Sequence, residues 1–145
     1  MMKEVAIAII YEAYASASHP PKLLMQLRDP LPYIVYPGHW GLFGGHLEPG
    51  EDSETALKRE LLEEIQYAAP ICEYFGNYGD DAVHRHVFTV PLHVPITALS
   101  LQEGWDMVLL PWSELKKGQC YSQKAKQVRP VGEPHLKAIT DFFEV

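Results

Sequence analysis

The chain has 145 residues, of which 47% are hydrophobic and 21% charged, a composition typical of a soluble globular protein. This length suits one compact domain, residues 1–145, that is long enough to bury a core. A formal net charge of −7 without a cluster of lysine and arginine disfavours a polymeric nucleic-acid partner, whereas a small nucleotide held through a metal ion is compatible.

The cysteine content and the apolar segments further restrict the class of protein to which this chain can belong. Cys72 and Cys120 are too few for a disulfide framework, which favours two ordinary thiols and a cytoplasmic location. The apolar stretch near the N-terminus is interrupted by Glu4 and Glu12, and it lacks both the length of a membrane span and a cleavage site of small residues. We therefore expect a core strand there and no membrane partner, and we leave self-association into a homodimer open.

Runs of β-branched and apolar residues predict the first elements in chain order. Strands are expected over Val5–Tyr14 and Leu23–Leu27, with a loop at Ser16–Pro21 between them. The Pro-rich, aromatic stretch Asp29–His39 is a loop long enough to border a site. A short strand over Trp40–Phe43 then leads into a glycine-rich turn.

The second half of the chain predicts further strands and one substantial helix. The expected elements are strands over Ile71–Tyr78, Val83–Val94 and Met107–Leu110, the last of them buried, a helical turn over Pro111–Leu115 and a helix over Glu133–Phe143. Pro91 indicates an edge position or a bulge in its strand. Together with the helix described next, this order predicts an α/β (α+β) sandwich.

The segment Gly45–Tyr67, GHLEPGEDSETALKRELLEEIQY, joins the glycine turn to an acidic helix. At about 100° per residue, Glu63 and Glu64 lie on either side of Glu60 within an arc of about 100°. Such like charges repel one another unless a cation neutralises them. Mg²⁺ or Mn²⁺, which prefer oxygen ligands, suit this role, and the segment therefore predicts a divalent metal site.

The rest of this helix explains how the acids are held. Leu57, Leu61 and Ile65 form an apolar stripe beside the acidic arc, so the acids are expected at a buried helix edge. Arg59 precedes Glu63 by four residues and can pair with a carboxylate and orient it. The alternative, for an arbitrary glutamate-rich helix, is a solvated surface helix of mixed charge.

The spacing G-x5-E-x7-R-E-U-x-E-E-x-G-U, where U is a bulky aliphatic residue, resembles the signature box of the Nudix hydrolases. The positions that carry the resemblance are Gly45, Glu51, Arg59, Glu60, Leu61, Glu63 and Glu64. The match departs at Gln66, where the family has glycine, and mildly at Tyr67. Trp40–Gly45 is also similar to the strand that leads into the box.

The resemblance implies a Nudix-like mixed sheet between helices and a metal-dependent pyrophosphohydrolase. It implies water attack at phosphorus in a nucleoside diphosphate linked to another moiety. It further implies Glu60, Glu63 and Glu64 as metal ligands, Arg59 as the residue that orients them, and the carbonyl of Gly44 as an added ligand.

Gly45 and Glu51 complete the box. The missing side chain of Gly45 lets the turn approach the helix closely. Glu51 contributes to the metal or its outer shell, or is simply a carboxylate favoured at a helix N-terminus. Asp52 or Ser53 is the expected N-cap.

Candidates outside the box come from later loops and strands. Glu103, just before the strand at Met107, is a candidate ligand or general base, or else a surface turn acid. Trp105 and Tyr33 or Tyr36 suit stacking on a nucleobase, although core or loop packing is the commoner role of such residues.

His84, Arg85 and His86 follow one another in a predicted strand. The two imidazoles would share one face of the strand, as zinc requires, yet two ligands without nearby cysteines make a poor zinc site. We therefore favour an exposed strand face, with Arg85 as a phosphate contact.

The last expectations concern the substrate, the alternatives to an enzyme and the end of the acidic helix. Subfamilies for ADP-ribose, dinucleoside polyphosphates and NADH carry a proline or tyrosine downstream of the box, where this chain has Val83–Arg85, and this argues against those substrates. A catalytically silent nucleotide-binding sensor and a structural cation site are alternatives to an enzyme. Because glutamine tolerates positive φ poorly, we expect the helix to continue through Gln66 to Ala69 rather than end in a left-handed residue.

Overall fold

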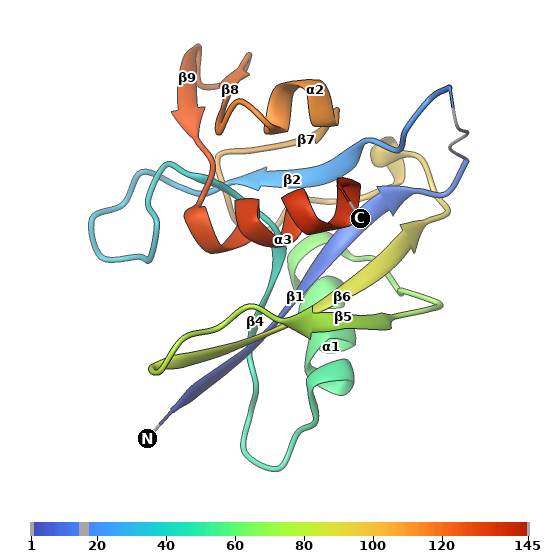
Figure 1. Ribbon diagram of the computed structural model, residues 1–145, viewed down its shortest axis with the longest axis vertical. Coiled ribbons are helices and arrows are strands. Elements are labelled where there is room, and N and C mark those ends of the chain that lie inside the picture. Colours follow the sequence, from blue (N-terminus) through green and yellow to red (C-terminus); the bar gives the residue numbers. More distant parts are fainter. Residues whose placement is uncertain (1, 15–17, 145) are drawn as a thin grey trace.

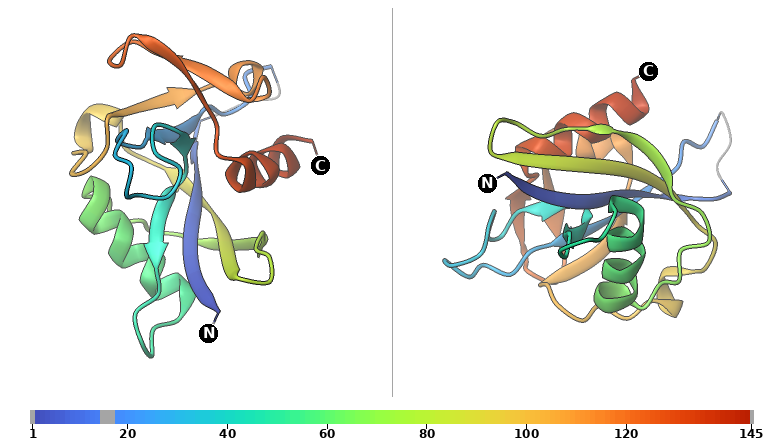
Figure 2. Two further views of the ribbon diagram at one scale, coloured as in Figure 1. Left: turned by 90° about the vertical axis from the view of Figure 1, so that its left-hand side faces the viewer. Right: turned by 90° about the horizontal axis from the view of Figure 1, so that it is seen from below.

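In the computed structural model, residues 2–14 and 18–144 are described, so the predicted loop at Ser16–Pro21 lies partly outside the described residues. A mixed sheet separates helix α1 (Ser53–Ile65) from helix α3 (Glu133–Phe143), as Figures 1 and 2 show. The sheet contains β1 Lys3–Glu12, β2 Leu23–Leu27, β3 Trp40–Gly41, β4 Phe43–His46, β5 Glu73–Asn77, β6 Val83–Leu92 and β7 Asp106–Leu110. The remaining elements are η1 Ile96–Ala98, α2 Trp112–Leu115 and a hairpin of β8 Gln119–Ser122 and β9 Gln127–Pro130.

Strand β1 is the centre of the sheet. Along its whole length it pairs in parallel with β6. On its other edge it has two antiparallel partners in succession, since β4 pairs with Val5–Ala8 and β2 pairs at Tyr11. The sheet therefore divides beside β1 into two branches. One branch is β4, which precedes α1 in the chain, and the other is β2, which pairs with β3 and β7. Residues of both branches, including Trp40 of β3 and Gly44 of β4, line the cavity described below.

Alternate residues of β1 supply two separate cores, because successive side chains of a strand point to opposite faces. Ala6, Ala8 and Ile10 pack on the face that carries α1. Ile7 and Ile9 pack on the face that carries α3. The α1 core also contains the predicted apolar stripe, whose members Leu57, Leu61 and Ile65 are fully buried.

Most predicted elements are present with small shifts in their ends, but the burial of one strand needs correction and one hairpin was not predicted. Strand β7 is only half-buried except at Asp106. Strand β6 lies between β1 and β5, but its pairing with β5 stops at Thr89, so Pro91 occupies a locally unpaired edge on that side. The β8–β9 hairpin is absent from the predicted elements, because Gln119–Ser122 and Gln127–Pro130 carry no apolar run.

Helix α1 ends at Ile65, and the expectation that it continues to Ala69 is wrong. Gln66 has φ 58° and ψ 36°, a left-handed conformation. The backbone N–H groups of Gln66 and Tyr67 donate to the carbonyls of Leu62 and Leu61 at 3.1 and 3.2 Å, which satisfies the helix end. The reversal lets the Tyr67 side chain enter the core, where it is 5% exposed and its hydroxyl donates to the Pro91 carbonyl at 2.7 Å. This tertiary contact overrides the local preference.

None of the helices in the described ranges combines the length and the apolar character that a membrane span requires.

Candidate active site

Helix α1 is fixed at its N-terminus and along its apolar stripe. Asp52 is the N-cap, and its carboxylate accepts a hydrogen bond of 2.8 Å from the Thr55 N–H, as capping requires. The buried stripe sets the rotation of the helix about its axis. Glu60 and Glu64 consequently lie beside strand β4 rather than in open solvent.

Arg59 contacts three of the four glutamates of the signature, namely Glu51, Glu60 and Glu63. Its guanidinium donates two hydrogen bonds, of 2.8 and 2.9 Å, to the two carboxylate oxygens of Glu51. A third nitrogen contacts Glu60 at 2.9 Å and Glu63 at 3.4 Å. The contact with Glu51 lowers the pKa of that carboxyl to about 2. Arg59 therefore links the start of the helix to two of the predicted metal ligands.

The glycine turn approaches α1 closely at Gly44 and Gly45. The Gly44 N–H donates a hydrogen bond of 2.9 Å to Glu64 Oε1. At Gly45 a Cβ atom would lie 2.5 Å from the Glu60 carboxyl carbon, so the predicted close approach is present. Gly44 itself has φ 147°, and a Cβ there would clash with the backbone of Ala6. Gly44 is thus required by space, whereas a side chain at Gly45 would have to displace the Glu60 carboxylate.

Glu64 is half-buried beside the glycine turn. Burial and the neighbouring charge of Glu60 raise the pKa of Glu64 to about 8, while the Gly44 hydrogen bond acts in the opposite direction. The ionised form is therefore disfavoured until positive charge is added.

The loop before β7 brings Glu103 to the same place. The N–H groups of Ser100 and Gln102 donate to the carbonyls of Ile65 and Glu64 at 3.1 and 2.9 Å, which ties the loop to the end of α1. The side chain of Gln26 donates to the Glu103 carbonyl at 2.9 Å. Glu103 also helps to raise the pKa of Glu64. The structure therefore groups Glu103 with the acids of the box.

These acids line one side of a cavity of about 540 Å³, a size that suits a small ligand. Three cationic residues, Lys3, Arg28 and Arg85, also line it. Arg28 Nε is buried and has no hydrogen-bond partner among the described residues. A cavity with both carboxylates and an unsatisfied guanidinium suits a ligand that carries phosphates and a metal ion.

His135 lines the same cavity from the first turn of α3. Its Nδ1 accepts a hydrogen bond of 2.7 Å from the Leu42 N–H, so the proton of the neutral ring lies on Nε2. Burial, with the charges of Arg85 and Arg28, lowers the pKa of His135 to about 4. His135 is thus a neutral hydrogen-bond donor at neutral pH.

The structure brings most predicted site residues into this cavity. The predicted residues that line it are Gly44, Gly45, Glu60, Glu63, Glu64, Arg85, Tyr36 and Glu103. Arg59 and Glu51 support it from outside. Trp105 does not line it; that side chain packs at the edge of the α3 core, and Tyr33 is 81% exposed.

Sequence reasoning missed Lys3, Arg28 and His135. Lys3 and Arg28 lie at the ends of strands, where a charged residue indicates only the strand boundary. His135 lies in an ordinary amphipathic helix. The one signal that could have paired Lys3 with Arg85 is the alternation of side chains along β1 and β6, since the odd-numbered residues of both strands point to the same face.

The acids fit a hard divalent cation by the chemistry of their donors. Glu60, Glu63, Glu64 and Glu103 offer carboxylate oxygens, the ligands that Mg²⁺ and Mn²⁺ prefer, and the charge of Arg28 only partly offsets the burial of Glu64. No three of these residues have carboxylate oxygens within 4.8 Å of one another, and Arg59 contacts Glu60 and Glu63. In the part of the chain that the structure describes, the only group of three donors within 4.8 Å of one another is Glu4, His84 and His86.

The fold and the acid-lined cavity define a class of protein. Comparison with known proteins identifies this class. A family model of the NUDIX domain matches residues 4–129, and the chain therefore belongs to the NUDIX domain family. Proteins named nucleoside triphosphatase NudI, from Enterobacter sp. (strain 638) and Escherichia coli O1:K1, are each 58% identical to it over 31 residues. This stretch covers 21% of the chain and only 22% of each relative's length.

Solved structures agree in fold. A structure from a study of MutT from Aliivibrio salmonicida and Vibrio cholerae has a TM-score of 0.65 at 21% identity, over 81% of this chain and 86% of the other. The NUDIX domain of Shewanella oneidensis NrtR, complexed with ADP ribose, has a TM-score of 0.73 at 19% identity, over 99% and 88%. The observed fold is thus the predicted Nudix-like arrangement of a mixed sheet with helices.

Proposed function

We propose that this protein is a metal-dependent pyrophosphohydrolase that cleaves a nucleoside diphosphate linked to another moiety. The observation that carries the proposal is the shared cavity, in which the acids of α1 face Lys3, Arg28 and Arg85. Carboxylates alone would repel a phosphate chain. With a divalent cation they attract one, and the cationic side chains balance the remaining charge.

Each acid has a distinct proposed task. Glu60, Glu63 and Glu64 would hold Mg²⁺ or Mn²⁺, and the bound cation would lower the pKa of a water and screen phosphate charge. Glu63 is the least constrained of the three, since its side chain is 59% exposed and its contact with Arg59 is long at 3.4 Å. Glu103 is available as a further ligand or as the base that accepts the proton of the attacking water.

Arg59 and the glycine turn position these groups. In the absence of a cation, Arg59 balances the charges of Glu60 and Glu63. Its two bonds to Glu51 hold the guanidinium in place. Glu60 and Glu63 would hold the cation together with Glu64, and the carbonyl of Gly44 would be an added ligand. The Gly44 N–H fixes the orientation of Glu64.

The remaining cavity residues bind and orient the substrate. Arg28, whose Nε lacks a partner among the described residues, and Arg85 are the proposed phosphate contacts. His135 and Tyr36 line the part of the cavity near the start of α3. The Nε2–H of His135 is a donor for a carbonyl of the nucleobase, and Tyr36 offers a ring for stacking.

The substrate class is proposed from chemistry and from the relatives together. The NudI relatives are named nucleoside triphosphatases, and a triphosphate contains the linkage proposed here. ADP ribose, bound by the NrtR domain, contains the linkage too, although the downstream markers expected for such substrates are missing. Both cysteines are free, which suits the cytoplasm, where such nucleotides are found.

A substrate panel tests this proposal. The protein is mixed with nucleoside triphosphates, nucleotide sugars and ADP ribose, with Mg²⁺ or with EDTA, and the products are resolved by chromatography. We expect a nucleoside monophosphate from at least one compound, and only with Mg²⁺. Binding without any turnover would instead identify a nucleotide sensor, and a cation that stabilises the fold without any nucleotide effect would identify a structural site.

A further inference from the structure

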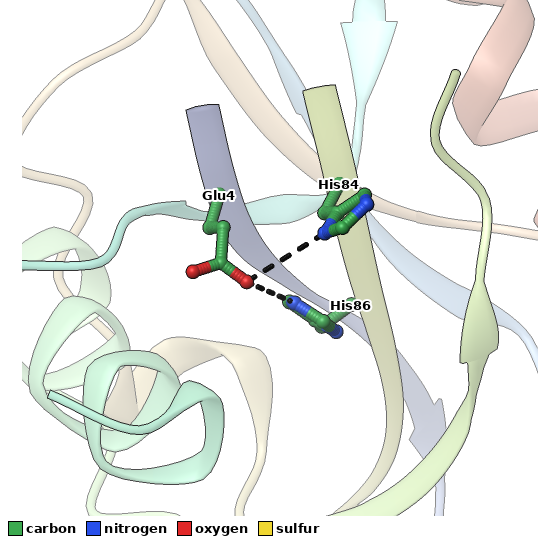
Figure 3. Close-up of side chains that lie close together, drawn as sticks. All are labelled: Glu4, His84 and His86. Carbon is green, nitrogen blue, oxygen red and sulfur yellow. Dashed lines mark hydrogen bonds and ion pairs between the residues drawn. The ribbon is translucent and has the colours of Figure 1, made fainter. Parts of the chain in front are cut away.

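On the face of β1 and β6 opposite the one whose side chains line the cavity, Glu4 of β1 lies beside His84 and His86 of β6 (Figure 3). Glu4 Oε1 is 3.1 Å from His86 Nε2 and 3.7 Å from His84 Nδ1. One ligand atom from each residue lies within 4.8 Å of the other two. Two ring nitrogens thus converge on a single carboxylate oxygen.

The strand register produces this convergence. Glu4 pairs directly with His84, and Ala6 pairs with His86. Because alternate side chains share a face, the two imidazoles project on the same side as Glu4. The small side chain of Ala6 stands opposite His86 and leaves room for the ring to turn toward Glu4. The third ligand that the sequence lacked therefore comes from a neighbouring strand.

His86 also has the hydrogen-bond support that metal-bound histidines usually have. His86 Nδ1 lies 3.3 Å from the hydroxyl of Tyr74 on β5, and this contact directs the other nitrogen, Nε2, toward Glu4. A polar partner on the second ring nitrogen is the usual support of a metal-bound histidine. The His86 side chain is 19% exposed and that of His84 41%, so the group is open to an ion from solvent.

We propose that Glu4, His84 and His86 form a second metal site, specific for Zn²⁺ or a similar borderline ion rather than Mg²⁺. Two imidazole nitrogens and one carboxylate oxygen are a donor set that zinc takes, with a fourth position left for water. Mg²⁺ prefers oxygen ligands and belongs to the acids of α1. The site lies behind the substrate cavity, since Lys3, Val5 and Arg85, from alternate positions of the same strands, line that cavity.

The test is a Zn²⁺ titration against a chromophoric chelator, with Mg²⁺ in excess so that the α1 acids are occupied. The parent should bind one Zn²⁺ per chain. Glu4→Gln, His84→Ala and His86→Ala should each weaken binding by roughly tenfold or more, and Tyr74→Phe by less. His93→Ala, which removes an exposed imidazole just beyond β6, is the matched control and should bind as the parent does.

Equal Zn²⁺ affinity in the parent and the three ligand variants, or no binding by the parent, would overturn the proposal. A second readout does not depend on the variants. Co²⁺ added to the parent with Mg²⁺ present should broaden the imidazole NMR signals of His84 and His86 and spare that of His93. Broadening of all three signals alike, or of none, would also overturn it. Neither measurement depends on the proposed hydrolysis.

Discussion

Gly44 and Glu64 are joined by a hydrogen bond of 2.9 Å from the backbone N–H to the carboxylate, and this bond fixes the innermost acid of the helix against the glycine turn. It requires the strand to approach α1 more closely than a side chain allows. A Cβ atom at Gly44 would clash with the backbone of Ala6, whereas the atoms nearest to a Cβ at Gly45 belong to the Glu60 carboxylate. The two neighbouring glycines should therefore respond differently to alanine.

Gly44→Ala should lower the free energy of unfolding by about 2–4 kcal/mol, because the new methyl group clashes with fixed backbone at a positive φ. Gly45→Ala should change it by less than about 1 kcal/mol, since Glu60 can move aside. Turnover by Gly45→Ala should nevertheless fall roughly tenfold or more, because the carboxylate is displaced. Urea unfolding and initial rates measure both. Equal stability of the two variants would contradict the assignment of the contacts.

Arg59→Lys should reduce kcat/KM by roughly 10- to 100-fold, equivalent to about 1.4–2.7 kcal/mol. An ammonium group cannot make the two bonds to Glu51 while also reaching Glu60. The Mg²⁺ concentration needed for half-maximal rate should change as well. Lys58→Ala is the control, since the ion pair that Lys58 makes within the described residues is with Glu54, at 3.1 Å on the exposed side. A parent-like rate and Mg²⁺ dependence in Arg59→Lys would show that Arg59 does not position the acids.

Gln66→Gly should stabilise the protein by about 0.5–1 kcal/mol, because glycine adopts the observed φ of 58° without the strain that a side chain brings. Leu62→Gly, one turn earlier at a 51% exposed position, should destabilise it by about 1 kcal/mol. Thermal or urea unfolding compares the two. Destabilisation by glycine at both positions would mean that the helix continues through Gln66 in solution.

His135 should make the folded state sensitive to acid. Its pKa is about 4 in the folded protein, below the ordinary value of about 6.5, so the unfolded chain binds the proton more readily. The stabilisation is complete above about pH 6.5 and is lost as the pH falls toward 4, by up to about 3 kcal/mol. Urea unfolding of the parent and of His135→Gln, which cannot titrate, should therefore converge toward pH 4.

His93→Gln is the control for this pH dependence, because His93 is exposed. It should follow the parent across the whole range. If the parent and His135→Gln lost stability in parallel between pH 6.5 and 4, His135 would not be held neutral by the fold.

Much of the site could be predicted because its residues lie in one short segment. The spacing of Glu60, Glu63 and Glu64 on a helix fixes their common face, and the stripe that includes Leu61 fixes which face is buried. Arg59 contacts the acids because residues four apart on a helix are neighbours. None of these relationships depends on the rest of the fold.

The remaining features depend on strands that meet only in three dimensions. Spacing in the sequence could not show that Arg28 and His135 lie near the acids, or that Glu4 lies beside the two histidines of β6. Local propensity places Gln66 in the helix, but the burial of Tyr67 decides the outcome. The hairpin of β8 and β9 has too few buried side chains to leave an apolar pattern.

The most direct test of the metal assignment is the hydrolysis rate of Glu64→Gln across a Mg²⁺ titration, measured on the fastest substrate of the panel. Glutamine keeps the size of the side chain and can still accept the Gly44 hydrogen bond, but it removes the charge that binds the cation. We expect a folded protein whose turnover falls by roughly a thousandfold, about 4 kcal/mol, and is not restored by excess Mg²⁺. Turnover within a few-fold of the parent at low Mg²⁺ would contradict the claim that the α1 carboxylates hold the catalytic metal.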